Sequence, residues 1–291
     1  MSAETSPFLE PLMVLWGRLN FISGMLFILS NYTDNYRDAL RRKYGEGRKD
    51  LSWLMCGKSV PITDLTGPTD NGWLYHYPSG GFSAQGEEYL SSADVIVRRE
   101  SAWVVAQGYE AFETFLKDSL AVFFLHAPST ADSKKLQEFD RRDNCSADRS
   151  TTAYWRQFVG ETYRGRNNQE ILKALRQHAP GLAEAEKDNT RNIDLVKWYA
   201  SAGAARHAVA HSNMRLNASG LSHIPPDDSV YFPFEDKDGE KVLNLGQKQA
   251  DKCIETFAEY AFQVFKYLSK ATNDEWDILE KGGFRPKRVS V

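Results

Sequence analysis

Residues 87–128 read EEYLSSADVIVRRESAWVVAQGYEAFETFLKDSLAVFFLHAP, without a proline before Pro128. Apolar side chains recur there at the spacing of one helix face, at Trp103, Ala106, Tyr109 (or Glu110), Phe112, Leu116, Leu120 and Phe123. On another face, Glu110, Glu113 and Lys117 are spaced for ordinary i, i+3 and i+4 charge pairs. The pattern predicts one long amphipathic helix of about forty residues.

Helical patterns also fill most of the chain outside this stretch. A first helix is predicted to start after Pro11 and to end at Gly45, which stops it. The other predicted helices are two short ones within 151–190, broken near Gly165 and Pro180, one over about 192–216, and one over 247–276. The fold class is therefore mainly α, a helical bundle with a long N-terminal helix.

One segment carries the β signal of the sequence. Residues 229–246, SVYFPFEDKDGEKVLNLG, place alternating aromatic residues before an Asp-Gly turn and a second apolar run. This pattern predicts a small hairpin, and Pro233 marks it as an edge element. Residues 45–85 are punctuated by Pro and Gly and are predicted to be loop-like. We therefore divide the chain into an N-terminal helix and irregular region (1–85), a helical domain (86–281) and a flexible tail (282–291).

The N-terminal segment, MSAETSPFLEPLMVLWGRLNFISGMLFILS, is apolar enough to raise the question of a membrane. Residues 12–30 approach transmembrane length, but Arg18 and Asn20 lie in the middle. A charge there costs roughly 2.5 to 3.5 kcal/mol in a bilayer. The segment also lacks the basic start and cleavage site of a signal peptide. We therefore expect a buried or partner-facing helix in a soluble, cytoplasmic protein.

The totals of the sequence exclude several classes of protein. The 291 residues carry a formal net charge of −3, so no global positive field attracts nucleic acid. Three separated cysteines, Cys56, Cys145 and Cys253, do not form a disulfide or zinc pattern. No glycine-rich phosphate loop, nucleophile elbow or paired-carboxylate signature occurs, and no cofactor is expected.

Residues 201–213, SAGAARHAVAHSN, combine tiny side chains with Arg206, His207 and His211. Between Ala200 and Ala210, eight of eleven residues are Ala, Gly or Ser. Such residues either let another helix pack closely, with the histidines hydrogen-bonded at that contact, or leave room for a substrate. A metal is a third alternative, since His207 and His211 are four residues apart. Its third ligand would have to come from elsewhere, and the candidates are Glu110, Glu113 and His178.

Arg206 and His211 together suit the cleavage of RNA. In an ideal helix they lie about 7.5 Å apart along the axis and roughly 140° apart around it, so the arginine stem must curl to bring them together. An imidazole can take the proton from a ribose 2′-hydroxyl or protonate the leaving 5′-oxygen. A guanidinium can hold the scissile phosphate and its added negative charge.

The helix containing RHAVAH resembles the signature Arg-x4–6-His helix of the HEPN superfamily, and residues 101–120 are similar to the opening helix of larger bacterial members. The resemblance covers roughly residues 86–272. The sequence after the motif, HSN, lacks the tyrosine that one toxin branch carries two residues beyond its histidine.

The resemblance implies an all-α, usually dimeric bundle and, in many members, a metal-independent endoribonuclease of toxin–antitoxin or antiphage systems. Arg206 and His211 would then be the catalytic pair, with His207 as the polar residue that supports the arginine. RNA, a second copy of the chain and possible regulation by another protein are the partners it implies. The contact with RNA would lie in YRGRNN, residues 163–168, because arginine pairs phosphate and stacks on bases.

A different class of protein accounts for the same residues. In a non-catalytic helical interaction module, the apolar segment 8–30 docks a partner and the two histidines only satisfy a packed interface. The two hypotheses differ in what they require of Arg206 and His211. The enzyme needs them in a solvent-reachable cleft, and the module needs them buried and fully hydrogen-bonded.

Overall fold

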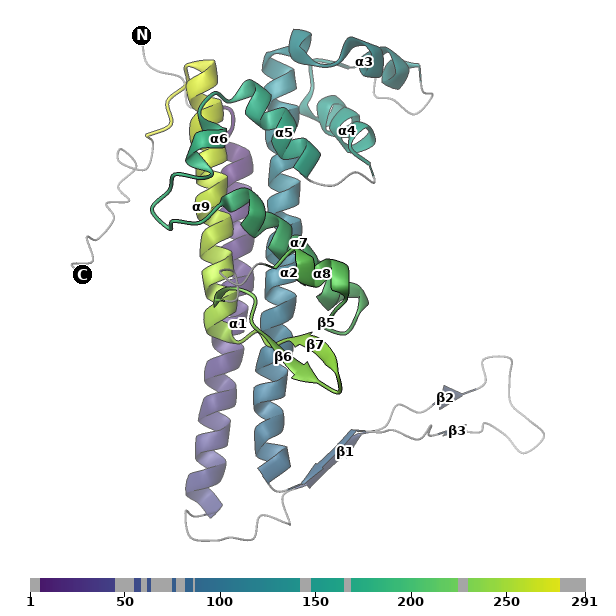
Figure 1. Cartoon of the computed structure of the whole chain (residues 1–291), viewed down its shortest axis with the longest axis vertical. Helices are drawn as coiled ribbons and strands as arrows, with labels where there is room; N and C mark the ends of the chain where they lie inside the picture. The colour runs from purple at the N-terminus through teal and green to yellow at the C-terminus, as the bar shows by residue number, and fades with distance from the viewer. Residues whose placement is uncertain are drawn as a thin grey trace. The chain divides into compact units, whose positions relative to one another are not determined.

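The computed structural model describes residues 6–44, 55–58, 62–63, 75–76, 82–85, 87–141, 148–164, 169–224 and 230–277. This part of the chain is mainly helical, as predicted (Figure 1). Contacts between residues group the chain into two compact units, one of residues 1–25 with 101–291 and one of residues 26–100.

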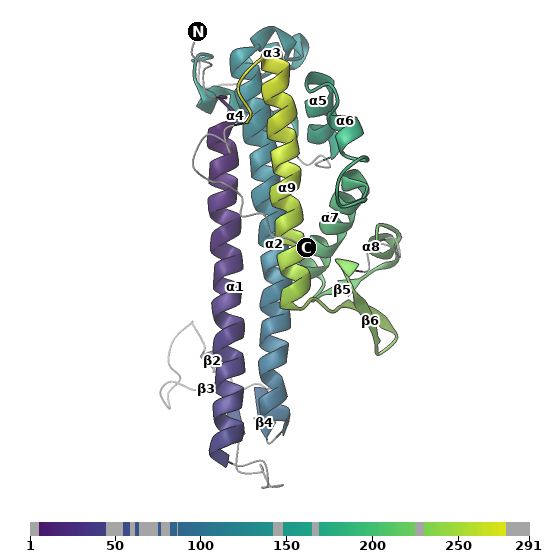
Figure 2. The same cartoon turned by 90° about the vertical axis from the view of Figure 1, so that its left-hand side faces the viewer.

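Three long helices form the frame of the first unit. They are α1 (Leu9–Tyr44), α2 (Glu87–His126) and α9 (Gln247–Thr272), of which α1 contributes residues up to 25 and α2 residues from 101. The serines of α1 and its N-terminal flank show that α1 runs antiparallel to α9, since Ser6 Oγ lies 2.7 Å from Ser269 Oγ and Ser23 donates to Asp251 at 3.1 Å. Figures 1 and 2 show α2 running beside α9 in the same direction.

The core of this unit is aromatic where α2 and α9 meet. Phe112 lies 5.6 Å from Phe257 and 5.0 Å from Tyr260, measured between ring centroids, and all three are fully buried. A Cβ added to Gly108 would approach Ile254 Cδ1 to 2.7 Å and Phe257 to 3.2 Å, so a larger residue here would force these side chains to move. The long helix predicted from residues 87–128 is thus a central element of the fold.

Shorter helices cover this frame. They are α3 (Ser133–Asp140), α4 (Thr152–Thr162), α5 (Gln169–His178), α6 (Leu182–Ala185), α7 (Leu195–His211) and α8 (Ala218–Ser222), with a 3₁₀ turn at Pro128–Thr130. Phe124 of α2 packs on Trp155 and Phe158 of α4, with centroids 5.8 and 5.9 Å apart. The end of α2 is therefore buried under α4.

A three-stranded antiparallel sheet follows α7. Its order is β5 (Arg215–Leu216), β7 (Glu240–Leu243), β6 (Phe234–Lys237), and β6 pairs with β7 from Phe234↔Leu243 to Lys237↔Glu240. Asp238 and Gly239 both have positive φ, 54° and 79°, as a two-residue hairpin turn requires. The predicted hairpin and the edge position of β6 are confirmed, whereas β5 was not predicted.

The second unit includes residues 26–44 of α1, residues 87–100 of α2 and two antiparallel strand pairs. β1 (Met55–Lys58) pairs with β4 (Phe82–Gln85), and β2 (Ile62–Thr63) pairs with β3 (Tyr75–His76). The prediction of a single β segment in the chain was therefore wrong. These strands are two to four residues long and lack apolar alternation, so no local sequence pattern predicts that they are strands or that they pair.

Three helix predictions also need correction. α1 begins at Leu9 and not after Pro11, because a proline in the first turn loses no intrahelical hydrogen bond. α3 was missed within a polar stretch, although Asp132 caps it by accepting from the backbone N–H groups of Lys134 and Lys135. α7 spans 195–211 and not 192–216, since Asn213 and Met214 after it adopt positive φ.

Several predicted features lie outside the described residues. They are the helix stop at Gly45, the helix break near Gly165, Cys145, the last four residues of YRGRNN (165–168) and the tail 282–291.

Within the described ranges, one helix, Leu9–Arg42, is long and apolar enough to cross a membrane, with a mean hydropathy of 1.7 in its most apolar window. Of that window, 22% is buried. In the first unit, Leu12, Leu15 and Leu19 of this helix are at most 2% exposed. A helix that packs into the core of a soluble protein meets the same criterion of length and composition.

Candidate functional site: Arg206, His207 and His211 on α7

One side of α7 is buried against α2 and α9. Asp194 caps its N-terminus by accepting from the backbone N–H groups of Val196 and Lys197, which fixes where the helix begins. Tyr199 then stacks on Tyr109 of α2, with ring centroids 4.9 Å apart, and Trp198 meets Phe257 of α9 at 4.8 Å. These large side chains fix the rotation of α7 about its axis.

The small residues of α7 serve this packing. Ser201, Ala202 and Ala205 are completely buried. A Cβ added to Gly203 would lie 3.2 Å from the hydroxyl oxygen of Tyr109, closer than most Cβ contacts. Close helix packing, the first of the alternatives posed by the sequence, is therefore a property of this face.

The three polar side chains lie on the outer side of the same helix. His207 and His211 are exposed, and the side chain of Arg206 keeps 32% of its accessible surface. Arg206 Nη1 lies 3.4 Å from His211 Nε2, and the rings of His207 and His211 are 5.0 Å apart between centroids. The structure thus brings together all three residues singled out in the sequence, and the long arginine stem bridges the 140° separation.

Glu110 of α2 completes this cluster. Its Oε1 accepts hydrogen bonds from Arg206 Nη2 at 2.7 Å and from Arg206 Nε at 3.2 Å. The predicted i, i+3, i+4 pairing on α2 therefore holds only between Glu113 and Lys117, and Glu110 pairs across helices. This role was not predicted; its only sign in the sequence is that no Lys or Arg stands three or four residues from Glu110.

Of the three candidate third ligands for a metal, Glu110 is paired with Arg206, and the other two are engaged elsewhere. His178 stacks on Phe123 at 4.5 Å between centroids, and burial lowers its pKa. Glu113 is paired with Lys117. Over the residues that the structure describes, no group of three or more His, Cys, Asp and Glu is arranged to hold a metal ion.

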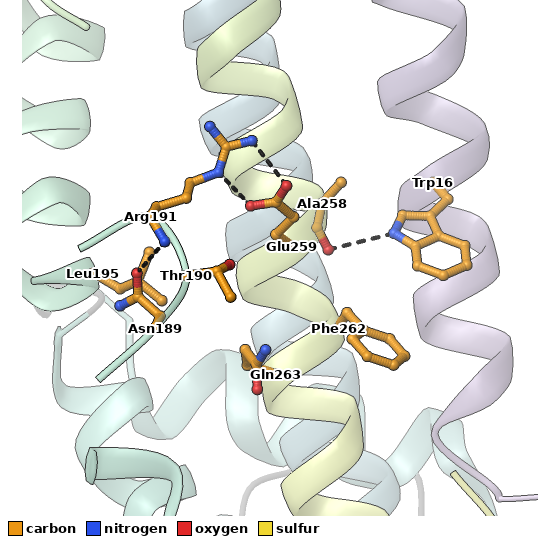
Figure 3. Close-up of a pocket in the computed structure, with 9 residues that line it drawn as sticks. All are labelled: Trp16, Asn189, Thr190, Arg191, Leu195, Ala258, Glu259, Phe262 and Gln263. Atoms are coloured by element: carbon orange, nitrogen blue, oxygen red, sulfur yellow. Dashed lines mark hydrogen bonds and ion pairs between the residues drawn. The ribbon is translucent and has the colours of Figure 1, made fainter. Parts of the chain in front are cut away.

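Two pockets lie near α7, at opposite ends of it. One, of about 260 Å³, lies between α1, the loop before α7, and α9, and Figure 3 shows Arg191 there pointing at Glu259. Hydrogen bonds to Glu259 raise the pKa of Arg191 above its ordinary value. Because these charges satisfy each other, we assign them the structural role of holding the loop on α9.

The second pocket, of about 220 Å³, is formed by α7, β5 and α8 and includes His207 in its wall. It therefore adjoins the polar cluster, whereas none of Arg206, His207 and His211 lines the pocket of Figure 3.

On an exposed face, the guanidinium of such a pair can bind a phosphate. The imidazole beside it can exchange a proton with the bound group. Comparison of the chain with family models, curated proteins and solved structures finds no significant match.

Proposed function

We propose that this protein is a metal-independent endoribonuclease of HEPN type that acts as a homodimer in the cytoplasm. The setting that the sequence resemblance supports is a bacterial antiphage-defence or toxin system. The observation that carries the proposal is the 3.4 Å approach of Arg206 Nη1 to His211 Nε2 on a solvent-reachable face. The interaction module requires the opposite, a pair that is buried.

In this mechanism His211 is the general acid or base. It takes the proton from a ribose 2′-hydroxyl, whose oxygen attacks the adjacent phosphorus, or it protonates the 5′-oxygen that leaves. The products are a 2′,3′-cyclic phosphate and a free 5′-hydroxyl. Two histidines are available for the two proton transfers, from one copy of the chain or from two facing copies. His207 supports the arginine or takes the second transfer, and its ring lies 5.0 Å from that of His211.

Arg206 holds the phosphate and the charge that it gains in the transition state. Glu110 acts on Arg206 and does not act on the substrate. Because its carboxylate holds Nε and Nη2, the remaining terminal nitrogen Nη1 is directed at His211. We therefore assign Glu110 as a positioning residue for the guanidinium.

A non-catalytic interaction module remains the second candidate function, and one observation favours it. In the first unit, Met13, Val14, Phe21 and Met25 of α1 are 47% to 68% exposed, although they are large and apolar. Exposed apolar patches of this kind are typical of surfaces that dock a partner.

The test is cleavage of a mixed RNA pool by the full chain in EDTA, beside His211→Ala and Arg206→Ala. We expect the wild type to cut and to leave 2′,3′-cyclic phosphate ends, and both variants to lose the activity. His126→Ala, at an exposed histidine at the end of α2, is the matched control and should cut normally. Equal cleavage by all four proteins would mean a contaminating nuclease. If no protein cuts and the two site variants lose dimerisation, the interaction module is the better description.

A further inference from the structure

We propose that the pocket beside His207 binds the nucleotide next to the scissile phosphate, so that it selects single-stranded RNA. This inference rests on the proposed function, because it assigns a second subsite to the same substrate. The pocket is lined by residues of α7, β5 and α8 and of the turns beside them: Ala204, His207, Ala208, Arg215, Leu216, Asn217, Ser219, Gly220 and His223.

The charged and aromatic groups of this pocket fit one nucleotide. Among the described residues that line it there is no carboxylate, and Arg215 supplies a positive charge. Arg215 Nε pairs with Glu240 at 2.8 Å, but both side chains are at least half exposed, and such a pair contributes at most about 1 kcal/mol. Arg215 can therefore exchange this partner for a phosphate. The rings of His207 and His223 are exposed and can stack on a base, as histidines do in sites for unpaired RNA.

The size of the pocket restricts what it can hold. Its volume of about 220 Å³ is below the roughly 300–1,000 Å³ of typical small-molecule sites. The pocket thus suits one nucleotide unit of a longer chain and not a complete cofactor. Ala204, Ala208 and Gly220 keep it open, because their side chains are the smallest available.

The position of the pocket connects it to the proposed catalytic pair. His207 belongs to both places, since it lines the pocket and its ring lies 5.0 Å from that of His211. An RNA strand with its scissile phosphate on Arg206 and His211 would therefore pass over His207 to reach the pocket. A duplex keeps its bases stacked and paired, whereas a single strand can turn one base into the pocket.

The experiment measures binding separately from cleavage. A fluorescent single-stranded RNA with 2′-O-methyl groups, which cannot be cut by 2′-hydroxyl attack, is titrated with the full chain, and its anisotropy gives Kd. We expect each of three substitutions to raise Kd about fivefold or more: Arg215→Gln, His223→Gln and Ala204→Leu. A change of about this size corresponds to the loss of one stacking or phosphate contact. The Leu side chain fills the pocket without removing a charge, so it distinguishes loss of space from loss of charge.

Two control variants test whether a rise in Kd is specific to the pocket. Arg156→Gln removes an exposed arginine that is likewise paired with a carboxylate, Asp118, and His126→Gln removes an exposed histidine of α2. Both should leave Kd unchanged, and circular dichroism melts show that each variant is folded. Unchanged Kd in all three pocket variants, or an equal rise in the controls, would overturn the subsite.

The two proposals fail in different ways. If the pocket variants weaken binding but the wild type cuts no RNA, the subsite holds and the nuclease assignment fails. If the wild type cuts through His211 and the pocket variants bind normally, only the subsite fails. A wild-type chain that binds no RNA would overturn both.

Discussion

Removal of the Glu186 carboxylate should destabilise the first unit strongly. Its carboxylate is 1% exposed and accepts from Arg176 Nε at 2.6 Å, from Arg176 Nη2 at 3.0 Å and from the Tyr260 hydroxyl at 2.5 Å. Burial of the Tyr260 hydroxyl, together with the neighbouring carboxylate, raises the pKa of Tyr260, so this phenol stays a donor. The network joins α5, the turn after α6 and α9.

The magnitude of the effect follows from what Glu186→Ala leaves behind. The substitution strands a guanidinium whose side chain is only 22% exposed and a phenol that is completely buried. Breaking a buried ion pair by removing one partner costs about 3–5 kcal/mol. Because Arg176 can still reach some water, we expect about 3 kcal/mol. For a unit of this size, that is a fall in Tm of roughly 6–12 °C.

The assay is urea unfolding followed by circular dichroism, with Tm as a second measure. The matched variant is Glu186→Leu with Arg176→Met and Tyr260→Phe, which removes both charges and the buried phenol hydroxyl and keeps apolar volume. It should recover most of the loss, since replacing a whole buried pair is often neutral. A loss below about 1 kcal/mol in Glu186→Ala would refute the reasoning, because it would mean that the network contributes no more than a surface pair.

Three further predictions concern packing, pH and positioning. Gly108→Ala should destabilise the protein by about 1–3 kcal/mol in the same urea titration, because the added methyl meets Ile254 and Phe257. Gly160→Ala on α4 has open space around it and should stabilise the protein by up to about 1 kcal/mol. Burial lowers the pKa of His178, so the unfolded chain binds its proton first, and the free energy of unfolding should fall as the pH drops through about 6.5. That slope should be smaller in His178→Phe, and an identical slope would assign it to other groups. Glu110→Gln should lower kcat for RNA about tenfold without raising KM, because the Arg206 guanidinium loses its fixed position but keeps its charge. An unchanged kcat would show that Glu110 has no role in the mechanism.

The parts of the fold that could be predicted from the sequence are those with a local cause. The helix period of residues 87–128 and the Asp-Gly turn of the hairpin each depend on neighbours within a few positions. The pairing of β1 with β4 joins Met55 to Gln85, and neither segment shows the alternation that marks a strand. The end of α7 at His211 depends on positive φ angles at Asn213 and Met214. A positive φ is uncommon for methionine, so the sequence pattern does not predict it.

The same distinction applies to the candidate site. The sequence pattern singled out Arg206, His207 and His211 because they stand within six positions on one helix. It did not predict the pairing of Arg206 with Glu110, which lies 96 residues away and meets Arg206 because α7 packs on α2. The pocket of Arg215 and His223 was missed for a related reason. It exists because the chain leaves α7 at His211 and returns along β5 and α8, whereas the predicted helix continued to residue 216.

The small residues of α7 lie in two different surroundings. Ala202, Gly203 and Ala205 face inward or toward Tyr109, where they allow α7 to approach α2. That approach brings Arg206 within reach of Glu110. Ala204 and Ala208 border the pocket beside His207 instead. Close packing is therefore a property of one side of the helix, and the proposed RNA subsite lies on another side. Enlarging an inward residue should cost stability first, whereas enlarging Ala204 should reduce RNA binding while the protein stays folded.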